Sequence, residues 1–169
     1  MQDEVERLLV AWRRERPDLD VEPLAVLSRV SRLARHLDRA RRAAFARHGL
    51  EAFEFDVLAA LRRAGRPYEL TPGDLLVQTL VASGTMTNRL DRLESRGLVR
   101  RHPDPADRRA VRVRLTARGR AKVDAVLGDL LDRERDVLGD LSRRQQQTLA
   151  GLLRAMLVRF DTPDQSGHG

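Results

Sequence analysis

Apolar side chains recur every three or four residues along most of this chain, which is the period of an α-helix. The pattern predicts helices over residues 3–16, 23–48, about 53–64, 71–80 and 83–97, and two more within residues 117–160. Pro17 ends the first of these helices, and Gly49 and Gly97 stand where left-handed C-caps are expected. We therefore expect a mainly α-helical chain.

A second period appears in only one place. Val111, Val113 and Leu115 alternate with Arg112 and Arg114, which is the pattern of a half-buried strand. The sequence LVRRH at residues 98–102 provides a second strand, and the Pro- and Asp-rich loop between the two predicts a hairpin. Two short helices followed by this basic hairpin predict a winged helix-turn-helix over residues 71–116, so the fold class is mainly α with a small β-wing.

Residues that cap helices stand at several of the predicted helix starts. Thr71, Ser83 and Thr116 each precede an apolar periodic segment, and Ser142 with Gln145 forms a capping box. The 169 residues suffice for one domain, which we place at residues 1–160, with a disordered tail at residues 161–169.

The composition excludes several classes of chemistry. The absence of cysteine removes disulfides, thiolate metal sites, cysteine nucleophiles and thiol redox sensing. The sequence shows no carboxylate pair, nucleophile–base set, metal-ligand spacing or phosphate-binding glycine loop, so we expect neither an enzyme nor a cofactor. With no signal peptide and no apolar run long enough to span a bilayer, we expect a cytoplasmic, nucleoid-associated protein without a membrane partner.

Basic charge is concentrated in two segments. The formal net charge is +7, while residues 26–48 carry +6, residues 84–118 carry +6, and the rest of the chain is neutral or acidic. Clustered positive charge attracts a polyanion such as DNA. In the first segment we expect the arginines to combine dimer contacts with attraction to the DNA backbone; they are Arg29, Arg32, Arg35, Arg39 and Arg42.

The second short helix has the side chains of a DNA-reading helix. Small polar groups in its first turns allow close approach to base edges; they are Ser83, Gly84, Thr85, Thr87 and Asn88. Asn88 can pair with adenine, and the threonine methyl groups can contact thymine. Arg92 and Arg96 lie further along the helix, where contacts with phosphates are expected. Each of these residues alone is equally consistent with a solvated helix face, whereas the order of the elements is specific.

At the hairpin tip, Arg108 and Arg109 stand beside Asp107. An arginine that is held by a neighbouring carboxylate can enter a narrow minor groove. We therefore include all three residues in the predicted DNA-binding surface.

Residues 70–119 closely resemble the MarR family, the multiple antibiotic resistance regulators. The shared features are D-x-R in the wing, here Asp107 to Arg109, and L-T-x-x-G after the second strand, here Leu115 to Gly119. The resemblance implies that Arg109 reads the minor groove and that Asp107 orients it. It also implies an intertwined homodimer through helices within residues 23–48 and 117–160, which accounts for the apolar stripe on the last helix.

A narrower resemblance, to the urate-responsive branch of that family, includes an added N-terminal helix at residues 3–16. Its signature residues fall on Trp12, Asp56, Arg89 and Arg101. Arg89 lies at the edge of the apolar face of its helix, away from Asn88, and can point into a pocket behind the DNA-reading surface. Two arginines suit a planar anion, Asp56 can accept a ring N–H or orient an arginine, and Trp12 can stack. The alternatives are a packing role for Trp12 and a structural ion pair between Asp56 and Arg89.

Together these features predict a sequence-specific transcriptional repressor. We expect it to bind double-stranded DNA at a pseudo-palindromic operator and to be released by a small anionic effector such as urate. Two alternatives stay open: a regulator that responds to another aromatic or carboxylate ligand, and a sequence-tolerant architectural DNA-binding protein.

Overall fold

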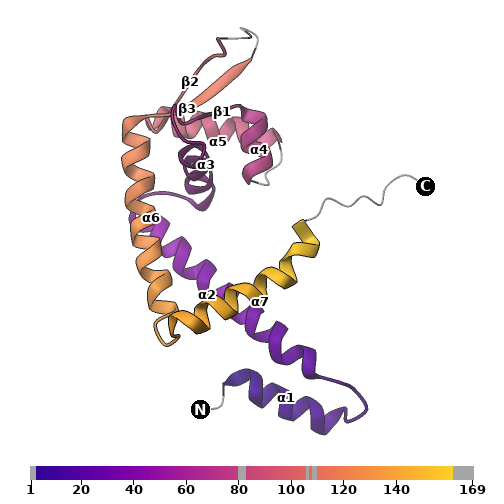
Figure 1. Ribbon diagram of the computed structural model, residues 1–169. Coiled ribbons are helices and arrows are strands. Elements are labelled where there is room, and N and C mark those ends of the chain that lie inside the picture. The colour runs from indigo at the N-terminus through magenta and orange to yellow at the C-terminus, as the bar shows by residue number, and fades with distance from the viewer. Residues whose placement is uncertain (1–2, 80–82, 106, 108–109, 162–169) are drawn as a thin grey trace, which may run out of the picture. The chain divides into compact units, whose positions relative to one another are not determined.

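The computed structural model describes residues 3–79, 83–105, 107 and 110–161, with the backbone alone at residues 83, 84 and 161. Most of these residues are helical (Figure 1). The helices are α1 (Glu4–Glu15), α2 (Glu22–Arg47), α3 (Ala52–Arg63), α4 (Pro72–Thr79), α5 (Ser83–Ser95), α6 (Ala117–Val137) and α7 (Arg143–Asp161). The strands are β1 (Glu69–Leu70), β2 (Val99–Pro103) and β3 (Val111–Leu115). The predicted mainly helical fold with a small β-wing is confirmed.

The chain divides into two compact units, Met1–Leu130 and Leu131–Gly169, which are described separately. The predicted single domain at residues 1–160 therefore comprises two units, and α6 runs across their boundary. The predicted helices end within two residues of the observed ones. Asp161 is the last residue of α7 and not the first of a tail, and the rest of the predicted tail lies outside the described residues.

The wing is a three-stranded antiparallel sheet with the order β1-β3-β2. Arg101 of β2 is opposite Val113 of β3, and Glu69 of β1 is opposite Arg114. Val113 is fully buried, so one face of the sheet packs on the core while Arg112 and Arg114 lie on the other. The sequence pattern does not predict β1, because two residues are too few to show an alternation of apolar and polar side chains.

The main core of the first unit forms around α3. Val57, Leu58, Ala60 and Leu61 are fully buried, because α4, α5, α6 and the sheet surround this helix. Such a helix has little polar surface, which explains its run of apolar residues.

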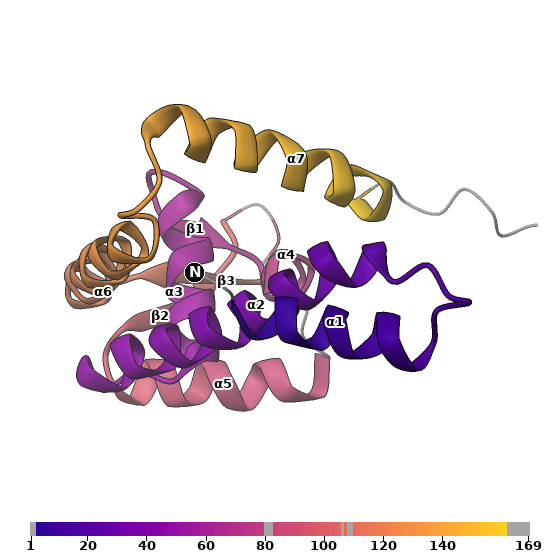
Figure 2. The same cartoon turned by 90° about the horizontal axis from the view of Figure 1, so that it is seen from below.

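A second, smaller core joins α1 to the N-terminal part of α2, and the two helices lie side by side in both views (Figures 1 and 2). Val5, Leu9 and Val21 are buried there. Asp3 caps α1 by accepting the Glu6 N–H at 2.8 Å, and its carboxylate also pairs with Arg29 of α2 at 2.8 Å. The hydrogen bond from Arg29 has the largest effect on the pKa of Asp3, and both hydrogen bonds lower it. Both apolar contact and charge therefore fix α1 on α2.

In the second unit, α7 begins at the predicted capping box. The Gln145 N–H donates to Ser142 Oγ at 3.3 Å, and the Ser142 N–H donates to Gln145 Oε1 at 2.8 Å. Within this unit α7 leaves large apolar side chains exposed, among them Leu152, Leu157 and Phe160. Across the described part of the chain, no helix is both long enough and apolar enough to cross a membrane.

The start of α6 contains a glycine at a position without room for a side chain. A Cβ on Gly119 would lie 2.0 Å from the Leu98 carbonyl oxygen and 2.9 Å from Leu115 Cδ1. This close approach sets α6 against the start of the wing, and it explains the glycine of the L-T-x-x-G motif. Gly128, further along the same helix, has no atom within 4 Å of the equivalent position.

We predict opposite effects for two glycine-to-alanine substitutions in α6. Gly119→Ala lowers the free energy of unfolding by about 2 kcal/mol or more, because backbone atoms must move apart. Gly128→Ala raises it by about 0.5–1 kcal/mol, because alanine is the better helix former. Urea denaturation at one fixed protein concentration measures both. Equal stability of the two variants contradicts the close packing of Gly119.

Candidate nucleic-acid interface

Helix α4 precedes the predicted DNA-reading helix α5 and has a complete N-terminal cap. The Asp74 N–H donates to Thr71 Oγ1 at 3.1 Å, and the Thr71 N–H donates to Asp74 Oδ2 at 3.1 Å. The hydrogen bonds from Thr71 lower the pKa of Asp74. Leu75, one turn on, is fully buried. The predicted cap at Thr71 is confirmed.

Helix α5 turns one face to the core and another to solvent. Met86, Leu90 and Leu93 are buried. Thr85, Thr87 and Asn88 are exposed, so they are free to meet a ligand as large as DNA. Their contacts with bases stay a prediction. Ser83 and Gly84 begin the helix as expected, but the Ser83 side chain lies outside the described residues.

The end of α5 is set by a glycine cap. Gly97 has a φ of +66°, which glycine adopts without steric cost. The Leu98 N–H donates to the Leu93 carbonyl at 3.0 Å, and Leu98 is buried behind it. This is the predicted left-handed cap with its apolar partner.

A buried carboxylate ties the end of α5 to α3. Glu54 is fully buried, and both of its oxygens accept from Arg96 Nη1 at 2.6 Å. Arg96 Nη2 donates to the Gly49 carbonyl at 2.7 Å, and the Glu51 N–H donates to Glu54 Oε2 at 2.9 Å. Because its guanidinium is engaged inside the protein, the structure does not favour the predicted phosphate contact of Arg96.

Two arginines of α5 lie over the aromatic ring of Phe53. The guanidinium carbon of Arg89 lies 4.6 Å from the ring centroid, and that of Arg92 lies 5.8 Å away. Arg92 also pairs with Glu51 at 2.5 Å. The flank of α5 that bears Arg89 therefore faces α3, as its position at the edge of the apolar face predicted.

Arg101 lies on the opposite flank of α5. Its Nη2 donates to Asp91 Oδ1 at 2.5 Å and to the Thr87 carbonyl at 3.3 Å, and its backbone N–H donates to Glu94 at 2.8 Å. By helical spacing, Thr87, Asp91 and Glu94 lie across the buried face from Arg89. Arg101 therefore does not join Arg89 in one pocket of this chain.

Asp56 lies on the exposed face of α3, near several arginines. The charges of Arg41, Arg63 and Arg89 act on its carboxyl group. Burial raises the pKa of Asp56, and these three arginines partly oppose that rise. Among the described residues, no ion pair or hydrogen bond joins Asp56 to Arg89. The geometry thus does not support the alternative of a structural ion pair.

Trp12 lies far from Asp56 and its neighbouring arginines within one chain. Arg13, its neighbour on α1, pairs with Glu22 at the start of α2, whereas Arg41 lies 19 residues further along α2. At 1.5 Å per residue, this separation is about 28 Å along the helix. Trp12 is 47% exposed, so it is not a buried packing anchor within one chain.

In the wing, a second buried carboxylate shapes the hairpin. Asp104 accepts from Arg112 Nε at 2.6 Å, and its N–H donates to the Ala110 carbonyl at 2.9 Å. Asp107 is exposed near the tip, and its carbonyl accepts the Ala110 N–H at 2.9 Å. Arg108 and Arg109 lie outside the described residues, so their pairing with Asp107 stays a prediction.

Four residues that position this interface do not stand out in the sequence: Phe53, Glu54, Asp104 and Glu69. Glu69 of β1 accepts from Arg114 of β3 and contacts His102 of β2 at 3.1 Å, which ties all three strands together. The one available signal was the pair Glu51 and Glu54, which has the spacing of a capping box.

Comparisons with known proteins agree with this architecture. The sequence profile of the MarR family matches residues 48–110. The HTH-type transcriptional regulator PecS of Dickeya dadantii is 42% identical over 150 residues, which cover 89% of this chain and 90% of PecS. This chain belongs to the MarR family. It is therefore a DNA-binding transcriptional regulator, as its sequence predicted.

Solved structures of MarR-family proteins extend the likeness to the fold. A mutant of E. coli MarR in complex with operator DNA has a TM-score of 0.66 and 30% identity, covering 82% of this chain and 99% of that one. BpsR of Bordetella bronchiseptica, whose DNA binding is regulated by 6-hydroxynicotinic acid, has a TM-score of 0.59 and 31% identity. The match covers 76% of this chain and 98% of the BpsR chain.

The pair Glu54–Arg96 can be tested by its contribution to stability. Arg96→Met leaves a buried carboxylate without its main partner, so we expect the free energy of unfolding to fall by about 3 kcal/mol. Adding Glu54→Gln should restore part of the loss, because the amide carries no charge. Urea denaturation measures both variants.

Arg100→Met is the control for that experiment, because Arg100 is exposed and has no ion pair within the described part of the chain. Its expected effect is within about 0.5 kcal/mol. If Arg96→Met is as mild as this control, Glu54 is not held by Arg96 in solution.

Proposed function

We propose that this protein is a dimeric repressor that binds a pseudo-palindromic operator and is released by a small planar anion such as urate. The observation that carries the proposal is that two sides of α5 have different surroundings. Its exposed residues Thr85, Thr87 and Asn88 are open to DNA, while Arg89 faces α3 and the carboxyl group of Asp56.

The DNA-binding part rests on groups that can discriminate bases. Asn88 has a donor and an acceptor that match adenine in the major groove, and threonine methyl groups pack on thymine methyls. The E. coli relative bound to operator DNA supports this assignment for the whole fold. The wing, with Asp107 near its tip, would contact the adjacent minor groove through Arg109.

The dimer rests on apolar surface that each unit leaves exposed. In the first unit, Val26, Val30 and Leu33 lie exposed on α2. In the second, α7 exposes Leu152 and Phe160. Large apolar side chains that a single chain leaves exposed on its helix faces are typical of obligate dimer interfaces. A two-fold dimer repeats α5 about its axis, so the operator must repeat its sequence in the same way.

The effector part rests on the surroundings of Asp56. Phe53 and Asp56 lie one turn apart on α3, and Arg89 of α5 stacks on Phe53. The charges of Arg41 and Arg63 act on the same carboxyl group as that of Arg89. A planar anion suits this place, because guanidinium groups donate paired hydrogen bonds and Asp56 can accept a ring N–H. In such a dimer, only the second chain can supply Trp12.

The coupling would act through Arg89. An anion that binds this guanidinium competes with its contact to Phe53, which joins the first half of α5 to α3 beside the buried side chains Met86 and Leu90. A shift of α5 changes the spacing of the two reading helices in a dimer. A coupling free energy of about 1–3 kcal/mol suffices for release.

Footprinting on the DNA that flanks the gene should show one protected pseudo-palindrome.

Asn88→Ala should weaken operator binding about tenfold. The salt dependence of binding should not change, because the variant loses a contact with a base and keeps every contact with phosphates. Ser95→Ala, two turns further along α5, is the matched control. Equal affinity for the operator and for random DNA would instead support an architectural DNA-binding protein.

Arg89→Gln should retain operator binding but lose release by urate, measured by electrophoretic mobility shift with increasing urate. Arg100→Gln, which removes the same charge from the wing, should keep the response. Release of the Arg89→Gln variant at the wild-type urate concentration contradicts the pocket. If no variant and no wild-type complex responds to urate, the effector belongs to another class while the DNA-binding part stands.

A further inference from the structure

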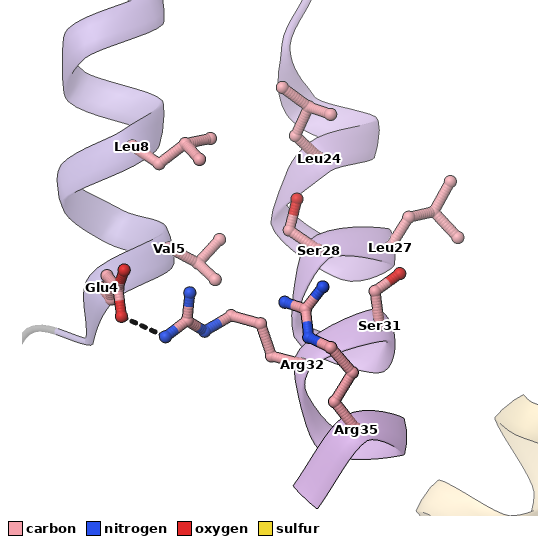
Figure 3. A pocket seen from close by; sticks show the side chains of 9 residues that line it. All are labelled: Glu4, Val5, Leu8, Leu24, Leu27, Ser28, Ser31, Arg32 and Arg35. Atoms are coloured by element: carbon pink, nitrogen blue, oxygen red, sulfur yellow. Dashed lines mark hydrogen bonds and ion pairs between the residues drawn. The ribbon is translucent and has the colours of Figure 1, made fainter.

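We infer that the groove between α1 and α2 is a separate binding site for an amphipathic carboxylate, one with an aliphatic tail and a single charged end. The groove has a volume of about 340 Å³, in the range of small-molecule sites. Figure 3 shows it between the two helices, with side chains from both directed into it. Its lining is Glu4, Val5, Leu8, Leu24, Leu27, Ser28, Ser31, Arg32 and Arg35.

The lining changes from apolar to cationic along the helices. Leu24 lies at one end, across from Leu8 of α1, Leu27 follows one turn on, and Arg35 lies at the other end (Figure 3). The 11 residues from Leu24 to Arg35 span about 16 Å of helix. The Arg35 side chain reaches back toward Ser28 and Ser31 (Figure 3), so the space between its guanidinium and Leu24 is shorter than this span. An extended chain of about eight carbons with a terminal carboxylate suits that shorter space and this gradient. The aliphatic walls favour a flexible tail over a charged or strongly polar body.

The charge at the polar end favours one anionic group. Arg32 is neutralised by an ion pair with Glu4 (Figure 3). Arg35 is exposed and has no ion pair among the described residues, and the hydroxyl groups of Ser28 and Ser31 have no hydrogen-bond partner there. One guanidinium and two hydroxyls match a monocarboxylate. A dianion is less suitable, because the Glu4 carboxylate lies at the same end.

This site shares no residue with the proposed effector pocket. The groove is built from α1 and the N-terminal half of α2, whereas Asp56, Arg63 and Arg89 belong to α3 and α5. By helical spacing, Arg35 and Arg41 point about 120° apart around α2. The inference therefore does not rest on the proposed function, and each can fail without the other.

Octanoate is the probe, and octanamide is its uncharged counterpart. Isothermal titration calorimetry on the full-length protein should show one octanoate site per chain and binding of octanamide at least about tenfold weaker, the effect of one charge-assisted interaction. Trp12, the single tryptophan, lies one turn beyond Leu8 on α1. Its emission should move to shorter wavelength as the tail displaces water.

Arg35→Gln should weaken octanoate binding about tenfold. Arg7→Gln is the matched control, since Arg7 is on α1 but outside the lining, and should change it less than about twofold. Leu27→Asn, at a half-exposed position that tolerates substitution, should weaken octanoate binding as well.

Four results would overturn the inference: no binding of octanoate, equal affinity for octanamide, wild-type affinity of Arg35→Gln, or loss of octanoate binding in Arg89→Gln. The last would place the ligand in the effector pocket instead. Retained octanoate binding by Arg89→Gln supports the groove, whatever urate does.

Discussion

The DNA-reading surface depends on a buried carboxylate that the protein cannot leave unpaired. Glu54 is fully buried at the start of α3, and Arg96 at the end of α5 supplies the compensating charge. Because an isolated buried charge is very costly, α5 has to keep its C-terminal end at this place. The same guanidinium reaches the Gly49 carbonyl, so the corner between α2 and α3 is fixed too. Among the described residues, the first half of α5 carries no such charge pair to α3: Met86 and Leu90 pack in the core, and Arg89 contacts Phe53.

The two ends of α5 therefore differ in how they are held and in what they expose. Its apolar face sets the rotation of the helix, its last turn is anchored by charge, and its first turns present Thr85, Thr87 and Asn88 to solvent. An anion near Asp56 would act on the half of α5 that bears Arg89, which is also the half that we propose reads bases. A ligand can then change DNA affinity by altering a cation–π contact, without breaking the core.

Most of the fold follows from the sequence because helices, caps and the wing strands are local features. Thr71, Thr116 and the pair Ser142 and Gln145 cap the helices where their spacing predicts. Pairings between distant segments do not follow, because periodicity shows which face is buried but not what covers it. Thus Glu54 with Arg96 was missed, and β1 was too short to detect. Trp12, Asp56, Arg89 and Arg101 were grouped by resemblance. In one chain, however, Trp12 belongs to the end of α1 that pairs with Glu22, which is about 28 Å along α2 from Arg41, and Arg101 lies on the other flank of α5.

Ion pairs with α1 and within α2 engage several arginines of the basic segment in α2. Its charge suggested attraction to DNA, but Arg29 and Arg32 pair with Asp3, Glu6 and Glu4 of the acidic helix α1, and Arg42 pairs with Asp38 in its own helix. Exposed pairs of this kind contribute little energy singly, about 0–1 kcal/mol each. Their effect is to select one register of α1 on α2, because a shift by one turn would set like charges together. Arg35 alone faces the groove without an acidic partner in the described chain, and this leftover charge is what makes the groove a site for an anion and not merely a packing seam.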